Sequence, residues 1–283
     1  MENKLAILFT GLVVLIATFS CESESDPASL SEDEIEEVVT LTESVFSQSS
    51  LDVDDVSTST NESLNGRFGP DNGGFGFRDC ITVESSDEED FPFTITLTYE
   101  DECSSNDVTK SGTISVEITG PLGEIGTQRI VTYDNYTVNG YVFSGVETFT
   151  NTGEGTFTVL LESAGIVTPE GNTLTWAHQK ERVQIEGENT DESGDDVFQT
   201  TGSSSGFLVG DELIYSQEIV APLISRKDCF WIVQGTVEST IGESSYALDY
   251  GEGACDDLAI RTENGTSEEV TLDFRRRKFQ DRN

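Results

Sequence analysis

Hydrophobic and polar residues alternate along most of the chain between residues 79 and 274, which is the pattern of β-strands with one buried face. In the clearest example, Ile95, Leu97 and Tyr99 fall on one face and threonines fall on the other. No helical segment of useful length separates these runs, which argues against a parallel βαβ sheet. We therefore expect a mainly β protein, with a large antiparallel sheet folded as a β-sandwich or open barrel. The expected strands are Phe93–Tyr99, Gly112–Ile118, Gln128–Tyr133, Tyr141–Thr150, Thr156–Leu161, Thr173–Ile185, Gly206–Val209, Glu212–Val220, Phe230–Glu238, Tyr246–Tyr250 and Glu268–Phe274.

One helix is expected ahead of the strands, over residues 31–47. Ser31 and Glu34 have the spacing of a capping box at a helix N-terminus. Apolar residues then recur on one helical face, at Ile35, Val38, Val39, Val45 and Phe46. We expect this amphipathic helix to pack on the chain's own sheet, with partner binding as the alternative. Residues 48–76 are rich in Ser, Asp and Gly and predict a linker.

Two cysteine-bracketed segments resemble each other and predict an internal repeat. Each begins with Asp-Cys, and its two cysteines are separated by 23 or 26 positions. In both, Leu-x-Tyr precedes the second cysteine and Gly-Thr follows it, so we expect a divergent repeat over residues 79–118 and 228–272. An even set of four cysteines in an exported chain predicts two disulfides, in one of three connectivities. The repeat favours the pairs Cys80–Cys103 and Cys229–Cys255.

Residues 1–20 have the features of a signal peptide, with a basic residue ahead of a short apolar run. The run ends in Ser20-Cys21, which resembles a bacterial lipobox and predicts that Cys21 carries a lipid anchor, with ordinary secretion as the alternative. Residues 21–30 are acidic and predict a tether. An acidic stretch directly after the cysteine resembles the surface-display signal of Bacteroidota lipoproteins, which implies an outer-membrane protein that is surface-exposed, with a periplasm-facing one as the alternative. The remaining divisions are residues 31–78 for the helix and linker, 79–274 for the β domain and 275–283 for a basic tail.

The formal net charge of −39 at pH 7 limits the partners that this chain can bind. Nucleic-acid phosphates and anionic lipid surfaces both attract Lys and Arg, so the charge argues against nucleic acid and against peripheral docking on acidic lipid. The tail is the exception, since it holds five of the 15 basic residues: Arg275, Arg276, Arg277, Lys278 and Arg282. We expect a solvated end, with pairing to the acidic body or to lipid phosphates as the alternatives.

Catalytic signatures are weak in this sequence. His178 is the single histidine, so a Ser-His-Asp triad or a multi-histidine zinc site would depend on it. It lies in an alternating segment beside Trp176, where a packed strand residue is the simpler interpretation. The chain has 54 Asp and Glu residues, so chance carboxylate pairs are frequent and spacing reveals no glycosidase pair.

The strongest local metal candidate is the acidic stretch of residues 189–196. It matches the start of an EF-hand calcium loop, with Asp191, Asp195 and Asp196 as carboxylate ligands. The twelfth position is Thr200 rather than Glu, and no helices flank the loop, so it is not an EF-hand. A solvated acidic loop without a cofactor is the preferred interpretation, with calcium as the alternative.

Aromatic residues cluster between Tyr133 and Phe149, and rings at strand spacing are more often core than ligand platforms. One group is a candidate for recognising a glycan or protein ligand, because amides lie beside aromatic rings near an expected hairpin turn. This group consists of Asn135, Tyr136, Asn139 and Tyr141.

A series of short segments in the middle and near the end of the chain resembles a protein family. The segments include Gly112-Thr113-Ile114, Gly120-Pro121-Leu122, Asp134-Asn135-Tyr136-Thr137-Val138-Asn139-Gly140, Cys229-Phe230-Trp231-Ile232-Val233 and Tyr250-Gly251-Glu252-Gly253-Ala254-Cys255-Asp256. Their order is similar to that in an uncharacterised group of envelope lipoproteins of the Bacteroidota. The resemblance implies a lipid anchor, an envelope location and an all-β fold, and it implies no catalytic residue or ligand.

The sequence thus favours a non-catalytic, lipid-anchored cell-envelope protein with a binding or structural role. An envelope hydrolase that acts on glycans through acidic residues is one alternative. A periplasmic carrier for a lipid or lipoprotein is another, and it would need a large apolar trough in the sheet.

Overall fold

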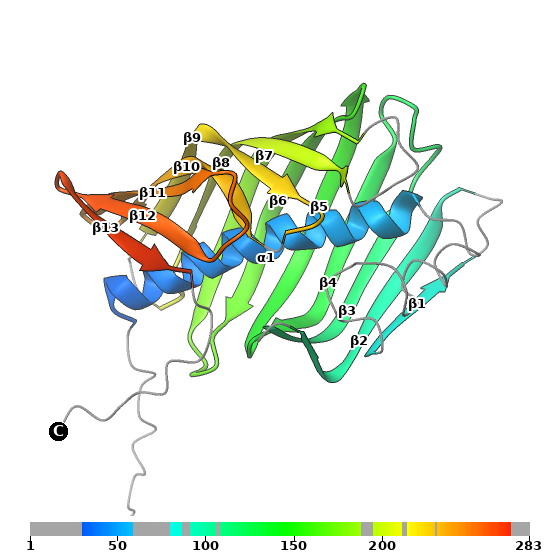
Figure 1. Ribbon diagram of the computed structural model, residues 1–283. Coiled ribbons are helices and arrows are strands. Elements are labelled where there is room, and N and C mark those ends of the chain that lie inside the picture. Colours follow the sequence, from blue (N-terminus) through cyan, green and yellow to red (C-terminus); the bar gives the residue numbers. More distant parts are fainter. Residues whose placement is uncertain are drawn as a thin grey trace, which may run out of the picture.

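The computed structural model describes residues 30–58, 80–86, 91–105, 108–187, 195–210, 214–229 and 231–272. These residues form one helix, α1 (Glu32–Thr58), and one sheet of 13 antiparallel strands whose spatial order is their order in the sequence (Figure 1). The strands are β1 (Ile81–Ser85), β2 (Phe93–Ser105), β3 (Val108–Ile118), β4 (Gln128–Val138), β5 (Tyr141–Gly153), β6 (Thr156–Val167), β7 (Thr173–Glu186), β8 (Val197–Phe207), β9 (Ile214–Arg226), β10 (Ile232–Ile241), β11 (Ser244–Glu252), β12 (Leu258–Glu263) and β13 (Thr266–Thr271). The predicted fold class is confirmed, and the sheet is open rather than closed into a barrel.

α1 lies along the concave side of the curled sheet and crosses its strands, from β11–β13 at the N-terminal end to β3 and β4 at the C-terminal end (Figure 1). The capping box forms as predicted, since the backbone N–H of Ser31 donates to Glu34 Oε2 at 2.8 Å. From Val38 onward nearly every described side chain of α1 is buried, polar residues included. The helix therefore packs on its own sheet and occupies the centre of the core.

The helix continues beyond its predicted end at residue 47 to Thr58, so the linker prediction was wrong for residues 48–58. Ser and Asp in this stretch have low helix propensity, which is why the sequence pattern indicated a linker. Leu51, Val53 and Val56 are nevertheless buried inside the concavity of the sheet. Burial of their apolar surface outweighs the weak local propensity.

A row of β-bulges bends the sheet around α1. The register shifts on either side of Gly112 in the β3–β4 pair, and similar shifts recur in the β4–β5, β5–β6, β6–β7 and β8–β9 pairs. Gly112 has φ +89°, and a Cβ on it would lie 2.1 Å from the carbonyl oxygen of Asn135. Glycine is required there because it allows both the positive φ and the close approach of the two backbones. The bulge also re-aims β4, so that Asp134 and Asn135 are both exposed while Tyr136 points inward.

The strand predictions are largely confirmed, although most strands are longer than expected. The alternation did not reveal β1 or β12, and it placed β8 at Gly206–Val209 only, whereas that strand runs from Val197 to Phe207. β8 contains a run of Thr, Gly and Ser that carries no hydrophobic alternation. Its backbone pairs with β7 on one side and β9 on the other, and these ladders hold it in place.

Several predictions concern residues outside the described ranges. They are the signal peptide, Cys21 and the acidic tether up to residue 29, the linker over residues 59–78, Asp191 in the acidic loop, and the basic tail of residues 275–283.

Candidate functional site

Most of the basic residues in the described ranges lie on the concave face, which we define as the side chains of the strands and of their adjoining turns that point toward α1. On β7, Lys180 and Arg182 continue the buried row of Trp176 and His178, while the residues between them face outward. Five basic residues of this face are at most 9% exposed: Lys110, Arg129, Lys180, Arg182 and Lys227. Lys and Arg are seldom buried without a partner, so the interior must supply opposite charges.

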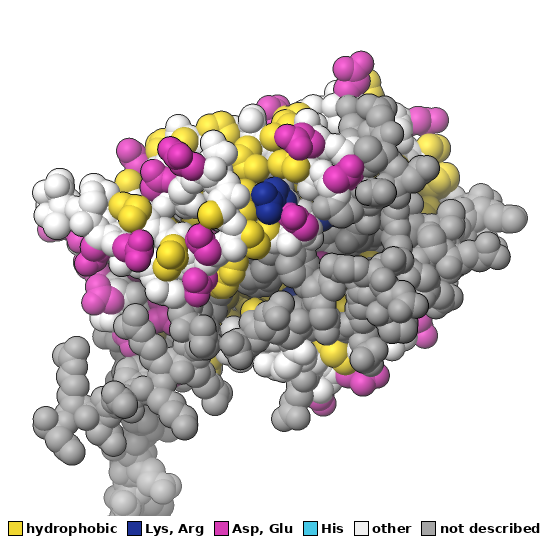
Figure 2. Space-filling view, viewed as in Figure 1, with side chains coloured by type: hydrophobic (Ala, Val, Ile, Leu, Met, Phe, Trp, Pro, Cys, Tyr) yellow, Lys and Arg dark blue, Asp and Glu magenta, His cyan; other side chains and the backbone are white. Residues whose placement is uncertain are grey.

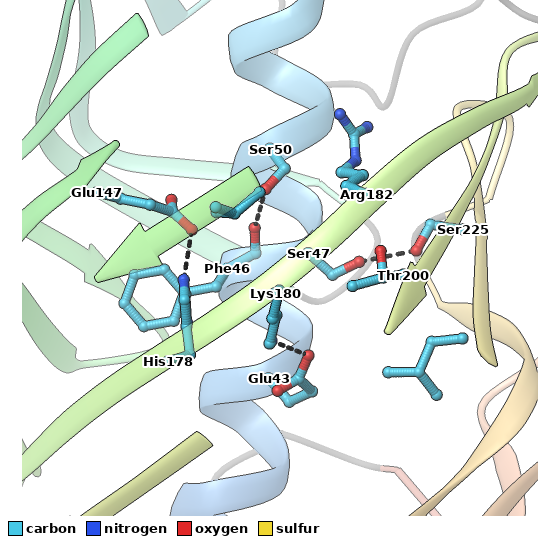
Figure 3. Close-up of a pocket in the computed structure, with 12 residues that line it drawn as sticks. Glu43, Phe46, Ser47, Ser50, Glu147, His178, Lys180, Arg182, Thr200 and Ser225 are labelled. Carbon is cyan, nitrogen blue, oxygen red and sulfur yellow. Dashed lines mark hydrogen bonds and ion pairs between the residues drawn. The ribbon is translucent and has the colours of Figure 1, made fainter. Parts of the chain in front are cut away.

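Acidic residues of α1 supply these charges, and we call the resulting set of contacts the ion-pair layer. Lys180 Nζ lies 2.5 Å from Glu43 Oε1, as Figure 3 shows between β7 and α1. Lys110 Nζ lies 3.2 Å from Asp52 Oδ2, and this carboxylate holds the pKa of Lys110 above its usual value although burial alone would lower it. Both lysines therefore remain charged inside the protein.

Asp54 is the centre of the layer because it faces two guanidinium groups. Arg129 and Arg182 both contact its carboxylate, with Arg182 Nη1 2.5 Å from Asp54 Oδ2. Burial alone would raise the pKa of Asp54, but the charges of Arg182, Arg129 and Lys227 outweigh it and hold the pKa below its usual value. The carboxylate therefore stays ionised and compensates cations from two distant strands.

The acidic residues recur along α1 at whole helical turns. Glu36, Glu43 and Asp54 are separated by 7 and 11 residues, about two and three turns, so they lie on one stripe of the helix. At the N-terminal end, both carboxylate oxygens of Glu36 accept hydrogen bonds from Arg261 of β12, at 2.7 and 3.0 Å. The acidic stripe thus meets basic residues along the length of α1 and fixes the position of the helix on the sheet.

A buried chain of hydrogen bonds beside the ion-pair layer contains the single histidine. The indole N–H of Trp176 donates to His178 Nδ1 at 3.3 Å, and because an indole can only donate, His178 is neutral with its proton on Nε2. His178 Nε2 then donates to Glu147 Oε1 at 2.9 Å, and the Tyr133 hydroxyl donates to Glu147 Oε2 at 2.7 Å. Ser49 of α1 ends the chain, 2.6 Å from the Tyr133 oxygen. Both nitrogens of His178 are occupied, so neither is free to activate a nucleophile.

A small cavity lies between α1 and the concave face, and Figure 3 shows the residues around it. Its volume of about 20 Å³ is room for about one water molecule. Ser47, Ser50, Thr200 and Ser225 contribute hydroxyl groups to its wall, and Ser47 Oγ lies 2.8 Å from Ser225 Oγ. The cavity is too small for a glycan, a lipid or a nucleotide.

The four residues of the predicted ligand-binding group do not share one surface. Tyr136 is 1% exposed and belongs to the concave face, whereas Asn135 is exposed at the bulge of β4. Asn139 has φ 50° and forms the β4–β5 turn, where its Oδ1 accepts a hydrogen bond from the Thr109 N–H at 2.8 Å. Tyr141 is half-buried at the start of β5. Tyr136 and Asn139 therefore have structural roles in the core and in the turn.

Of the predicted calcium ligands, Asp195 and Asp196 lie in the described part of the chain. Asp196 Oδ2 lies 2.7 Å from Lys227 Nζ, and its Oδ1 accepts a hydrogen bond from Gln184 Nε2 at 2.8 Å. Both oxygens of Asp196 thus have protein partners. Across the ranges that the structure describes, no cluster of three or more His, Cys, Asp or Glu residues is arranged to hold a metal. Calcium binding stays a prediction.

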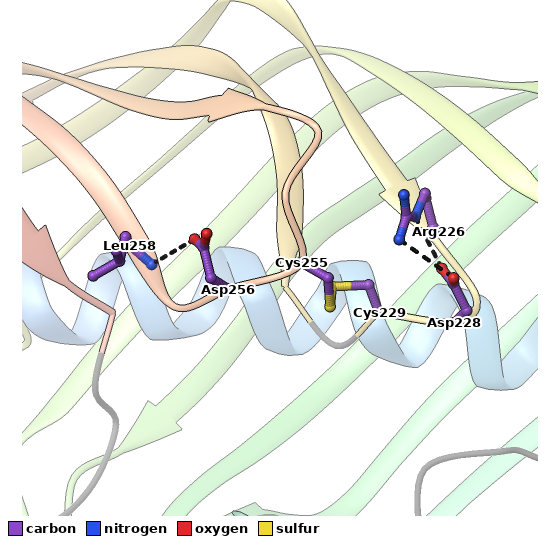
Figure 4. Close-up of a disulfide and its surroundings, with 6 residues drawn as sticks. All are labelled: Arg226, Asp228, Cys229, Cys255, Asp256 and Leu258. Carbon is purple, nitrogen blue, oxygen red and sulfur yellow. Dashed lines mark hydrogen bonds and ion pairs between the residues drawn. A yellow bond between two sulfur atoms is a disulfide. The ribbon is translucent and has the colours of Figure 1, made fainter.

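Both predicted disulfides are present, Cys80–Cys103 and Cys229–Cys255, with Cα–Cα distances of 5.5 and 5.7 Å. The first bridge joins the residue ahead of β1 to the end region of β2, and the second joins the segment ahead of β10 to the segment that follows β11. Figure 4 shows the second bridge beside the Arg226–Asp228 ion pair. Each closes a loop of about 25 residues, which stabilises the fold by roughly 3 kcal/mol through loop entropy. Whether the two segments share an origin stays a prediction.

Acidic residues dominate the outer surface. In Figure 2, Asp and Glu side chains are scattered over the visible face, and Lys and Arg are few. Among the described residues there are seven Lys and Arg, and five of them are buried on the concave face. The sequence analysis missed this segregation, although Lys180 and Arg182 continue a strand row that the alternation already assigned to the buried side. A second signal was available in the helix, whose charged residues are all acidic.

Comparisons with protein-family models, with curated proteins and with solved structures found no match. Within the ranges described above, no helix combines the length and the apolar character needed to cross a membrane. The function must therefore be inferred from the site itself.

Proposed function

We propose that this chain is a non-catalytic cell-envelope protein, held by a lipid anchor at Cys21, with a binding or structural role. The ion-pair layer is the observation that carries this proposal. The paired carboxylates of α1 and the cations of the concave face neutralise one another inside the fold, so these groups are not available to a substrate. The cavity beside them has room for about one water molecule.

A hydrolase that acts on glycans is less well supported. Such an enzyme needs two carboxyl groups that face each other across a cleft, roughly 5–10 Å apart, with the sugar between them. Glu43 and Asp54 each contact a buried cation, and Glu147 accepts hydrogen bonds from His178 and Tyr133. These carboxylates have structural partners in place of a substrate.

A carrier for a lipid or lipoprotein is also less well supported, because it would use the concave face as an apolar trough. α1 fills this face. The ring of Phe46 packs edge-on against those of Tyr133, Phe143 and His178, at centroid distances of 5.4, 6.1 and 5.4 Å. The chain itself therefore occupies the place that a carrier would keep for its cargo.

An outer-membrane location forms part of this proposal, with the β domain on the cell surface or facing the periplasm. The signal-peptide pattern, the lipobox-like Ser20-Cys21 and the acidic tether support it. Two disulfides are typical of an oxidising compartment outside the cytoplasm. A glycan or protein ligand would then meet the acidic outer surface, where calcium could bridge like charges.

Removal of the acylated sulfur tests the anchor. We expect Cys21→Ser to move the protein from the membrane fraction to the soluble fraction, and Ser25→Ala in the same tether to leave it with the membrane. The measurement is immunoblotting of both fractions after cell lysis, with metabolic labelling by a fatty-acid analogue as the second readout. Retention of Cys21→Ser in the membrane fraction would refute the lipid anchor.

A further inference from the structure

We propose that the concave face is a binding site for an acidic helix, and that α1 of a second copy of this chain can occupy it, giving a helix-exchanged dimer. This inference rests on the binding part of the proposed function and gives it a partner. It is independent of the anchor, because helix exchange is measured in a chain that lacks the signal peptide and Cys21.

The first support is the match of charge between the two parts. α1 carries nine acidic residues and no Lys or Arg. Five of the seven described basic residues contact its carboxylates: Lys110, Arg129, Lys180, Arg182 and Arg261. In a chain with a net charge of −39, this concentration of cations on one buried face makes that face selective for an acidic helix.

The second support is the kind of contact that holds α1. The hydrogen bonds that join it to the strands across the described residues run between side chains, such as Ser47–Ser225, Ser49–Tyr133 and Lys180–Glu43. The strands pair with each other through their backbones, and α1 takes no part in those ladders. Departure of α1 therefore breaks no backbone hydrogen bond between strands.

The third support is the length of the connection. Residues 59–79 separate the end of α1 from Cys80, and 21 residues reach up to about 70 Å when extended. That reach exceeds the length of α1, which is about 40 Å for 27 residues. The connection therefore permits α1 to lie in the sheet of a neighbouring copy.

The same contacts form whether α1 comes from its own chain or from a second one, so concentration decides between the two arrangements. A connection of this length gives an effective concentration on the order of millimolar, which favours the monomer in dilute solution. The exchanged dimer becomes more populated at high protein concentration. It also becomes more populated when a substitution weakens the contact of α1 with its own sheet but not with the sheet of the second copy.

Charge-swapped variants provide the test. Glu43→Lys places two ammonium groups together within one chain, because the new side chain faces Lys180, and Lys180→Glu places two carboxylates together in the other. In a mixture, an exchanged heterodimer restores an opposite pair at both places, because each sheet receives the helix that matches it. The double variant Glu43→Lys/Lys180→Glu restores the pair within one chain and serves as the matched control.

We expect each single variant to melt at least 5 °C below the unmodified chain, and an equimolar mixture to form a 1:1 dimer whose melting temperature returns toward that of the unmodified chain. Light scattering after gel filtration and native mass spectrometry measure the dimer. The double variant should be stable and monomeric. The proposal is overturned if the double variant is restored while the mixture stays monomeric and melts as its two components do.

A disulfide trap gives a second readout that depends only on proximity. Ser47 and Ser225 meet at 2.8 Å, so a Ser47→Cys copy mixed with a Ser225→Cys copy can form a 47–225 bridge only when the helix of one lies in the sheet of the other. We expect this covalent dimer at millimolar but not at micromolar protein, and no dimer when Ser203→Cys on the exposed face replaces Ser225→Cys. Absence of the 47–225 peptide at high concentration, with the intramolecular bridge formed in the Ser47→Cys/Ser225→Cys chain, overturns the proposal.

Discussion

The two faces of the sheet carry opposite kinds of charge. On β7, the concave side presents His178, Lys180 and Arg182 to α1, whereas the convex side presents Gln179 and Glu181 to solvent. Most soluble proteins place both signs of charge outside. This chain places most of its described cations inside and leaves the acidic residues to cover the surface.

The difference shows that a charge has a different role on each face. A convex carboxylate is screened by water and contributes little to folding. A concave charge must have a partner, because an uncompensated ion in the interior costs several kcal/mol. Buried ion pairs are seldom the most stabilising choice, but they can fix one arrangement of the parts. Here they determine which face of α1 meets which strand, and the following predictions test that division.

Asp54→Ala should have the largest effect, because it leaves Arg129 and Arg182 buried without their carboxylate. We expect the free energy of unfolding to fall by about 3–5 kcal/mol. Glu181→Ala removes a carboxylate from the convex side of β7 and should change it by no more than about 0.5 kcal/mol. Urea denaturation followed by circular dichroism measures both, and equal losses would contradict the division between the faces.

Gly112→Ala should disturb the bulge that turns one face of the sheet toward α1. The new Cβ would meet the carbonyl oxygen of Asn135 at 2.1 Å, so overpacking adds to the cost of a positive φ, for a total of about 2–4 kcal/mol. Gly171→Ala is the matched control, since Gly171 has φ +91° with nothing within 4 Å of its Cβ position. It should cost about 1–2 kcal/mol. If Gly171→Ala lowers the free energy of unfolding as much as Gly112→Ala does, the close approach of Gly112 to the Asn135 backbone plays no part.

Glu147→Gln should weaken the buried hydrogen-bond chain. His178 Nε2 and the Tyr133 hydroxyl donate to different oxygens of Glu147, and an amide places an NH₂ donor where one of these oxygens lies, so one of the two hydrogen bonds is lost. We expect a loss of about 1–3 kcal/mol in the free energy of unfolding. Glu117→Gln, at an exposed position of β3, is the control and should be close to neutral. If Glu147→Gln and Glu117→Gln unfolded at the same urea concentration, the buried hydrogen bonds of Glu147 would contribute nothing measurable to stability.

The smallest expected effect is the pH dependence of the stability that ionised Asp54 provides. Its pKa is lowered in the folded protein, so its contribution is complete above the unfolded pKa of about 3.9 and is lost as the pH falls through the lower folded value. Asp54→Asn should therefore be less stable than the unmodified chain at pH 7, and the gap should narrow below about pH 4. The measurement is the urea midpoint of both proteins between pH 7 and pH 2. A difference between the two midpoints that stays constant over this range would contradict the role of ionised Asp54.

Much of the fold was predictable because strand alternation is a local property of the sequence. The buried face of β7, for example, is predicted from five positions of the sequence, which contain Leu174, Trp176 and His178. The disulfide pairing was also predictable, from the likeness of the two cysteine-bracketed segments. Local patterns failed where tertiary contacts decide, as in the second half of α1 and in the Ser- and Gly-rich β8.

The ion-pair layer escaped sequence analysis for a different reason. Its partners lie far apart along the chain, 58 positions for Lys110 and Asp52 and 137 for Lys180 and Glu43. No spacing rule joins residues at such distances, because the curl of the sheet brings them together. The inward position of Lys180 was readable, but its partner on α1 was not.

The order of the strands has a consequence for how the chain reaches its structure. Each strand pairs only with its neighbours in sequence, so the sheet can grow by successive hairpins as the chain is synthesised from its N-terminus. α1 precedes every strand in the sequence, so it is available for packing when each hairpin forms. Its contact with Arg261 joins residues 225 positions apart and must close near the end. Until then Glu36 lacks its partner, so formation of this ion pair reports that β12, one of the last strands, has reached its place.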